Sequence, residues 1–247
     1  MRYLNYLLVL SLSMILISGC GQAAPGVDED LPPAAEEIEP IEYPQFITED
    51  QPDERVVKMV TNKGELIIRL YPKYAPLAVE NFLTHSEDGY YDGVLFHRVI
   101  NDFMIQTGDP GAHDPQLAGR GGESIYGEPF DDEFSPALAH FRGALSMANP
   151  GQPNMNGSQF FIVQSGPVVG DEDIARFEQF LDQSNVPEGK KELYLQHGGT
   201  PHLDYRHTVF GHVVKGMDVV DEIAQVEVGP NDRPVENIVI ERIEIIQ

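Results

Sequence analysis

Apolar and polar side chains alternate along several short stretches of this chain, which is the pattern of β-strands with one buried face. Arg55–Val60 and Glu65–Tyr71 form one such pair. The segment between them ends in Gly64, which supplies the positive φ that a tight turn often needs, so we expect a β-hairpin. Ile238–Ile246 alternates apolar and charged residues and predicts the last strand.

The stretch with the densest apolar residues predicts two more strands, Val94–Val99 and Phe103–Thr107, with a short turn between them. Side chains two positions apart on a strand share a face. We therefore expect Met104 and Gln106 to point the same way, with Arg98 reaching them from the neighbouring strand. A core hairpin with a surface arginine would explain the same pattern.

Two short helices are predicted among the strands. The first spans residues 75–83, has Pro76 where a first helical turn tolerates it, and is closed by Gly89. The second is Met217–Ile223. Further strands are expected at residues 144–147 and 159–163. Many short strands, two short helices and no β–α–β alternation predict a mainly β fold, a closed antiparallel barrel.

Composition narrows the choice of partners. The 247 residues carry a formal net charge of −24, and 41% of them are hydrophobic, enough for a core. So acidic a chain is a poor partner for nucleic acid, which requires a basic patch, and for electrostatic docking to anionic lipid. The stretch around Arg98 contains no evident nucleophile and no spacing of metal ligands.

The N-terminus resembles a bacterial lipoprotein signal. A short basic start precedes the apolar run Leu4–Ile17, which is too short for a comfortable membrane span. The run ends in Ile-Ser-Gly-Cys, so we expect residues 1–19 to be a signal peptide and Cys20 to be lipidated. An ordinary cleaved signal or an uncleaved anchor is the alternative. Cys20 is the single cysteine, so no intramolecular disulfide forms.

Residues 20–53 are rich in proline and acidic residues. Low hydrophobicity with like charge predicts a disordered, extended tether. The folded domain is then expected over residues 54–247.

Three stretches together resemble the cyclophilin family of peptidyl-prolyl cis–trans isomerases. They are FHRVINDFMIQTGD, LSMANPGQPNMNGSQFFIV and LDYRHTVFGHVVKGMDVV. The similarity covers the chain from about Arg55 to the C-terminus, except for one insertion. It implies an eight-stranded antiparallel β-barrel capped by two α-helices, and an enzyme that accelerates rotation about Xaa-Pro bonds without a cofactor or a metal.

The resemblance also implies roles for individual residues. Arg98 is the catalytic arginine, and Gln106 and His207 act beside it. The other candidates contact the substrate: Phe103, Met104, Ala148, Asn149, Gln159, Phe161, His202, Leu203 and Gly119. Several of these have a purely structural interpretation as well, since Phe161 and Leu203 fit a core and His207 fits a cap.

The chain departs from the family in two places. His202 stands where many members carry a tryptophan that helps to hold cyclosporin-type inhibitors, so we expect weak cyclosporin inhibition. The second departure is the insertion at residues 165–201, where the spacing of Ile174, Phe177, Phe180 and Leu181 and the segment Glu188–His197 predict two helices. The insertion is expected beside the proline pocket, as a packed flap or as a lid that selects substrates.

The sequence therefore predicts a monomeric, lipid-anchored, extracytoplasmic bacterial isomerase that assists the folding of exported proteins and acts on proline-containing polypeptides. A cyclophilin-like binding module, such as an adhesin or chaperone with incidental catalysis, is the alternative. A hydrolase lacks a supported nucleophile–base pair.

Overall fold

The computed structural model describes residues 42–49, 51–119 and 121–247. Residues 41–247 form one compact unit. The expected signal peptide, Cys20 and most of the expected tether lie outside the described residues. Among the described residues, no helix is long and apolar enough to cross a membrane.

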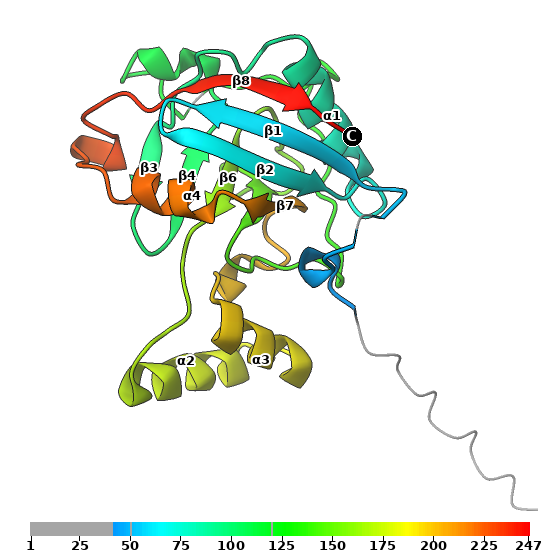
Figure 1. Cartoon of the computed structure of the whole chain (residues 1–247), viewed down its shortest axis with the longest axis vertical. Coiled ribbons are helices and arrows are strands. Elements are labelled where there is room, and N and C mark those ends of the chain that lie inside the picture. Colours follow the sequence, from blue (N-terminus) through cyan, green and yellow to red (C-terminus); the bar gives the residue numbers. More distant parts are fainter. Residues whose placement is uncertain (1–41, 50, 120) are drawn as a thin grey trace, which may run out of the picture. The chain divides into compact units, whose positions relative to one another are not determined.

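The centre of the unit is one eight-stranded antiparallel sheet in the order β3-β4-β6-β5-β7-β2-β1-β8 (Figure 1). The strands are β1 (Arg55–Thr61), β2 (Gly64–Leu70), β3 (Arg98–Ile100), β4 (Met104–Thr107), β5 (Ala144–Met147), β6 (Phe160–Val163), β7 (Val209–Lys215) and β8 (Ile240–Ile245). The two ends of the sheet meet where the segment before β3 pairs with the start of β8. There, Phe96 N donates to Ile238 O at 2.9 Å and Ile240 N donates to Val94 O at 2.9 Å. The sheet is thus curled into a barrel, and the predicted fold class is confirmed.

The turn of the β1–β2 hairpin is built as the sequence predicts. Thr61 pairs with Gly64, whose φ is 144°. A Cβ at Gly64 would lie 2.7 Å from Val219 Cγ2, so this position also allows helix α4 (Met217–Ala224) to approach the hairpin closely. Glycine is needed here for its backbone conformation and for its small size.

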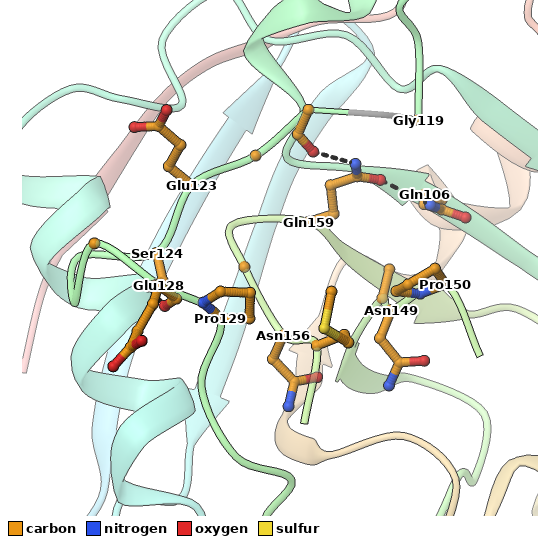
Figure 2. Close-up of a pocket in the computed structure, with 16 residues that line it drawn as sticks. Gln106, Gly119, Glu123, Ser124, Glu128, Pro129, Asn149, Pro150, Asn156 and Gln159 are labelled. Carbon is orange, nitrogen blue, oxygen red and sulfur yellow. Dashed lines mark hydrogen bonds between the residues drawn. The ribbon is translucent and has the colours of Figure 1, made fainter. Parts of the chain in front are cut away.

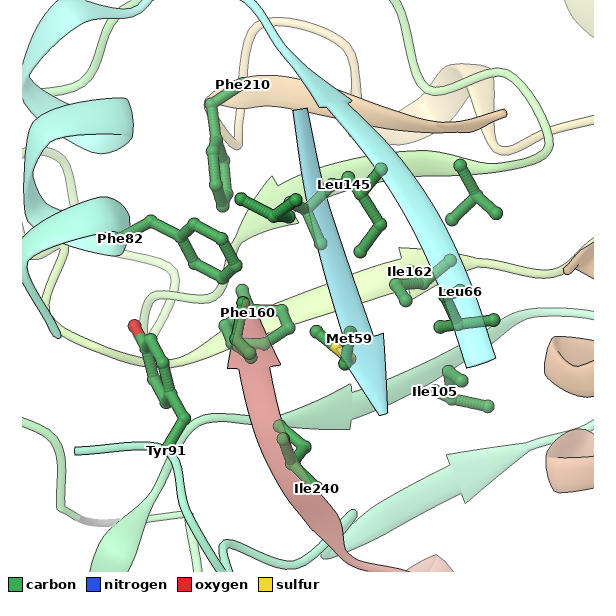
Figure 3. Packing of buried hydrophobic residues seen from close by; sticks show 14 of the residues in the cluster. Met59, Leu66, Phe82, Tyr91, Ile105, Leu145, Phe160, Ile162, Phe210 and Ile240 are labelled. Carbon is green, nitrogen blue, oxygen red and sulfur yellow. The ribbon is translucent and has the colours of Figure 1, made fainter. Parts of the chain in front are cut away.

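Two helices cover the core, α1 (Pro76–Glu87) and α4 (Met217–Ala224). The cluster of buried apolar side chains includes Phe82 of α1, whose ring lies 5.3 Å from that of Phe160 and 5.5 Å from that of Phe210 (Figure 3). The start of α1 has a partner that its own sequence does not reveal. The Glu133 carboxylate accepts from Leu77 N at 3.0 Å and from Ala78 N at 2.9 Å, and so caps free backbone donors.

The insertion forms the two expected helices, α2 (Asp171–Gln183) and α3 (Glu188–His197). They share a second apolar cluster in which Leu181 and Tyr194 are fully buried. Short 3₁₀ helices complete the elements: η1 (Pro44–Phe46), η2 (Pro110–His113), η3 (Pro201–Leu203) and η4 (Pro230–Asp232).

The end of the expected tether packs into the folded unit, which differs from the expectation that residues 20–53 are disordered throughout. Tyr43 is 8% exposed and belongs to the same apolar cluster as Tyr194. The Gln45 side chain binds both the N–H and the carbonyl of Ala139, each at 2.9 Å. The aromatic residues Tyr43 and Phe46 distinguish this segment from the acidic, proline-rich sequence before it. The folded unit therefore begins ahead of residue 54.

Candidate functional site

The β3–β4 hairpin brings together the two polar groups that the sequence singles out. Arg98 lies directly opposite Gln106 in the register of the two strands. The turn between the strands contains Asp102 at φ 58°, a conformation that aspartate tolerates better than most residues. Met104 and Gln106 lie two apart on β4 and share a face. Arg98 is 41% exposed, so its guanidinium is open to a ligand.

An open cavity of about 230 Å³ lies beside Arg98. Its lining contains nine of the twelve candidate residues: Arg98, Phe103, Met104, Gln106, Ala148, Asn149, Phe161, Leu203 and His207. Gly151 also lines it and was not among the candidates. We call this cavity the ring pocket. A guanidinium and an amide on the rim of a small apolar hollow suit the binding of an apolar ring and the polarisation of a bond beside it.

Gln159 supports the rim without lining the ring pocket. Gln106 Nε2 donates to Gln159 Oε1 at 3.1 Å, and Gln159 Nε2 donates to the Gly121 carbonyl (Figure 2). Gln106, Ala148 and Asn149 also border a neighbouring cavity of about 630 Å³, which Gly119 and Gln159 line. Gly119 therefore lies beside the neighbouring cavity and does not line the ring pocket.

The segment that contains Gly119, Gly121 and Gly122 is shaped by a residue that sequence reasoning missed. Asp109 is fully buried and accepts from Gly119 N at 2.7 Å, Gly111 N at 2.8 Å and Gly121 N at 3.3 Å. A carboxylate that accepts several backbone hydrogen bonds fixes the conformation of the chain around it. The signal was present, since an acidic residue directly before Pro-Gly commonly binds backbone N–H groups of a turn.

His207 lies in the pocket wall in its neutral form. Its Nδ1 is 3.1 Å from the Met147 carbonyl, and since a carbonyl only accepts, Nδ1 carries the proton. Burial, and then the nearby His140, lower the pKa of His207 below its ordinary value. Phe161 packs against both rings, edge-on to His207 at 5.5 Å and nearly parallel to His140 at 6.0 Å. His207 thus presents a ring with a fixed tautomer rather than a charge.

His202 lies at the rim. Its ring stacks on Phe103 with 5.8 Å between centroids, and it does not line the ring pocket. Burial is the first cause that lowers the pKa of His202.

Arg98 has an acidic neighbour that the sequence did not suggest. Asp232 Oδ2 lies 3.4 Å from Arg98 Nε, and Asp232 is held at φ 58° in the loop after α4. The pairing is at Nε, which leaves the terminal nitrogens of the guanidinium for a ligand. Within the described ranges, no cluster of three or more His, Cys, Asp or Glu could hold a metal ion.

Comparison with known proteins agrees, over most of the chain, with the family resemblance seen in the sequence. Residues 56–245 match the family model described as "Cyclophilin type peptidyl-prolyl cis-trans isomerase/CLD". A protein of Staphylococcus saprophyticus, assigned as a peptidyl-prolyl cis-trans isomerase, is 51% identical over 205 residues, covering 83% of this chain and 98% of that protein. A Staphylococcus aureus protein with the same assignment is 50% identical over 203 residues, covering 82% of this chain and 98% of that one.

Solved structures are similar too. The crystal structure of a Cryptosporidium parvum cyclophilin type peptidyl-prolyl cis-trans isomerase aligns with a TM-score of 0.61 and 32% identity, covering 78% of this chain and 98% of that one. A crystal structure of that protein in the presence of the dipeptide Ala-Pro aligns with a TM-score of 0.60.

Proposed function

Because the chain belongs to the cyclophilin-type peptidyl-prolyl cis–trans isomerase family and is such an isomerase, we propose that it acts on exported polypeptides with Arg98 as its catalytic residue. The observation that carries the proposal is the position of Arg98 on the rim of the ring pocket, opposite Gln106.

The chemistry requires little besides a well-placed donor. An Xaa-Pro bond rotates over a barrier of about 18–20 kcal/mol because the amide C–N bond has partial double-bond character. When the bond twists, conjugation is lost and the proline nitrogen gains a free lone pair. A hydrogen bond from the guanidinium of Arg98 to that nitrogen is stronger in the twisted state than in either planar state, which lowers the barrier.

The remaining candidates hold the substrate during this rotation. Phe103, Met104 and Phe161 would hold the proline ring in the ring pocket, since their apolar surfaces form its wall. Gln106, which Gln159 holds in place, would grip the peptide backbone. The Ala-Pro dipeptide present in the Cryptosporidium crystal is the smallest segment that contains an Xaa-Pro bond, which supports this choice of substrate.

The test is a protease-coupled isomerisation assay of Arg98→Ala with an Xaa-Pro peptide. Removing one donor that acts mainly in the transition state should lower kcat/KM about 10²-fold. Arg176→Ala is the matched control, because Arg176 is 74% exposed on α2 and does not line the ring pocket. A folded Arg98→Ala protein with near-normal turnover would remove Arg98 from the mechanism.

We further propose that the enzyme is held on the outer face of a bacterial membrane by acyl chains on Cys20. The apolar run that ends in Ile-Ser-Gly-Cys supports this location. Two or more acyl chains give lasting attachment to a bilayer, whereas one chain does not. Cells supplied with labelled palmitate should label the wild-type protein and leave Cys20→Ser unlabelled. Lack of label in the wild type would contradict the proposal.

Its clients would then be exported proteins whose folding waits for proline isomerisation, a step that takes tens of seconds or more without catalysis. The full-length enzyme should speed the slow refolding phase of such a protein, and Arg98→Ala should not. If Arg98→Ala instead suppressed aggregation as well as the wild type while neither sped refolding, the alternative of a binding module would be favoured.

A further inference from the structure

The insertion carries a buried charge that the catalytic mechanism does not use. Lys190 of α3 is 4% exposed, and its Nζ lies 5.4 Å from the ring centre of Tyr205 and 5.8 Å from that of Tyr43. One turn later on the same helix, Tyr194 is fully buried. A buried ammonium is costly unless it is paired and hydrogen-bonded, so its partner indicates what this face of α3 is for.

The partner is Asp204, which lies outside the insertion. Lys190 Nζ is 3.2 Å from Asp204 Oδ2, and the Tyr194 hydroxyl lies 2.9 Å from both carboxylate oxygens. His140 contributes its backbone N–H and its Nδ1, each 3.0 Å from Oδ1. Burial by itself raises the pKa of Asp204, but the bonds from His140 and the charge of Lys190 outweigh it and keep the pKa below its ordinary value. Asp204 is therefore a carboxylate with donors on several sides.

Asp204 directly follows one wall of the ring pocket. Leu203 is the preceding residue, and its carbonyl accepts from Arg206 N at 3.0 Å and from His207 N at 3.3 Å. These bonds make residues 203–207 one compact turn, so the position of Asp204 sets the positions of Leu203 and His207. Both side chains line the ring pocket.

His140 links the same carboxylate to a second wall. Its Nε2 lies 3.0 Å from Ser146 Oγ, which donates to the Thr208 carbonyl at 3.1 Å. Its ring is nearly parallel to that of Phe161, at an angle of 12°. The network from α3 therefore reaches the walls formed by Leu203, His207 and Phe161, while no described residue of α2 or α3 itself lines the ring pocket.

We propose that α3 is a strut for the ring pocket, in which Lys190 and Tyr194 are positioning residues that act through Asp204. Directional bonds to a charged group fix where residues 203–207 lie, whereas apolar contacts of the same area would allow them to slide. The strut assigns the insertion a role behind the pocket wall, in place of a lid over it. This inference rests on the proposed roles of Leu203 and His207 as walls for the proline ring.

A loosened wall should affect binding more than the chemical step. Arg98, Phe103 and Gln106 belong to the β3–β4 hairpin and have no hydrogen bond to the network. We therefore expect Lys190→Met and Tyr194→Phe to raise KM about 3- to 10-fold, the size that loss of one or two buried hydrogen bonds predicts, with kcat changed less than about two-fold.

The neighbouring lysine provides a matched control. Lys191 has the same side chain on the same helix, but it pairs with the exposed residues Asp182 and Glu188. Lys191→Met should leave KM and kcat unchanged. The imidazole NMR signals of His207 should shift in Lys190→Met and Tyr194→Phe and stay in place in Lys191→Met. Wild-type activity and the Arg98→Ala result test the catalytic proposal independently of these variants.

The outcomes are distinct. Folded Lys190→Met and Tyr194→Phe proteins with wild-type KM would overturn the strut, and so would a fall in kcat with KM unchanged. If Lys190→Met does not fold, Tyr194→Phe decides, because it removes only a hydroxyl. If neither variant folds, the strut is also overturned, because the network then stabilises the whole domain rather than the ring pocket in particular.

Discussion

Acid should destabilise this protein through one buried histidine in particular. His212 lies in the middle of β7, and 8% of it is exposed. Burial is the main cause that lowers its pKa, with further contributions from Arg69 and His197, from 6.5 to about 4. Gln45 Nε2 lies 3.3 Å from its Nδ1 and also donates to the Ala139 carbonyl, so Nδ1 is the acceptor in a neutral ring.

The direction in which pH changes the stability follows from which state, native or unfolded, binds the proton. Between pH 6.5 and 4 the unfolded chain protonates this histidine and the native protein does not, so native stability falls as the pH falls. A shift of this size corresponds to about 3 kcal/mol in full, and to roughly 2.5 kcal/mol between pH 7 and pH 4.5. That is a large part of the free energy of unfolding of a typical domain, about 5–15 kcal/mol.

The measurement is urea unfolding of the wild type and of His212→Leu at pH 7 and at pH 4.5. Other buried histidines also titrate, so the informative quantity is the difference between the two proteins. His212→Leu should lose about 2 kcal/mol less than the wild type over this range. Parallel losses in the two proteins would refute the reasoning, because the ring would then take up its proton in the native state as easily as in the unfolded chain.

Three further predictions concern the ends and the rim of the structure. A fragment of residues 54–247 should unfold at a lower urea concentration than a fragment of residues 42–247. The shorter fragment loses the packed Tyr43 and leaves both backbone groups of buried Ala139 without Gln45. Equal urea midpoints would mean that residues 42–53 add nothing to the stability of the domain. Asp232→Ala should change kcat/KM less than about five-fold, since ion pairs this exposed contribute up to about 1 kcal/mol; a larger change would give Asp232 a direct part in catalysis. Cyclosporin should inhibit the wild-type enzyme weakly in a peptide assay. His202→Trp should strengthen the inhibition, because the ring at this position already stacks on Phe103. Nanomolar inhibition of the wild type would contradict this prediction.

Local pattern was enough to predict most of the elements, although β3 begins at Arg98 and not at Val94 as expected. Alternation placed Arg98 across from Gln106, and capping signals gave Glu188–His197 as the helix that is α3. Such features depend on neighbours within a few residues, where periodicity and turn chemistry act. The resemblance to a family supplied the rest of the ring pocket, whose walls come from segments about 100 residues apart.

Pattern did not predict contacts between distant segments. The apolar stripe of α2 contains both Phe180 and Leu181, yet Phe180 is 38% exposed and Leu181 is fully buried. Which side of the stripe is covered depends on α3, and periodicity carries no information on that. Asp204 is likewise an ordinary acidic residue in the sequence, and its donors lie 10, 14 and 64 positions away.

The way the curled sheet ends has a consequence for an enzyme whose substrates are proline-containing peptides. A free strand edge is a template on which an extended polypeptide can add itself as another strand. Here the segment before β3 and the start of β8 pair with each other. The rest of β8 carries Glu241, Arg242 and Glu244, charges that discourage such addition. A bound peptide should therefore stay in the site as a substrate and not join the sheet as a further strand.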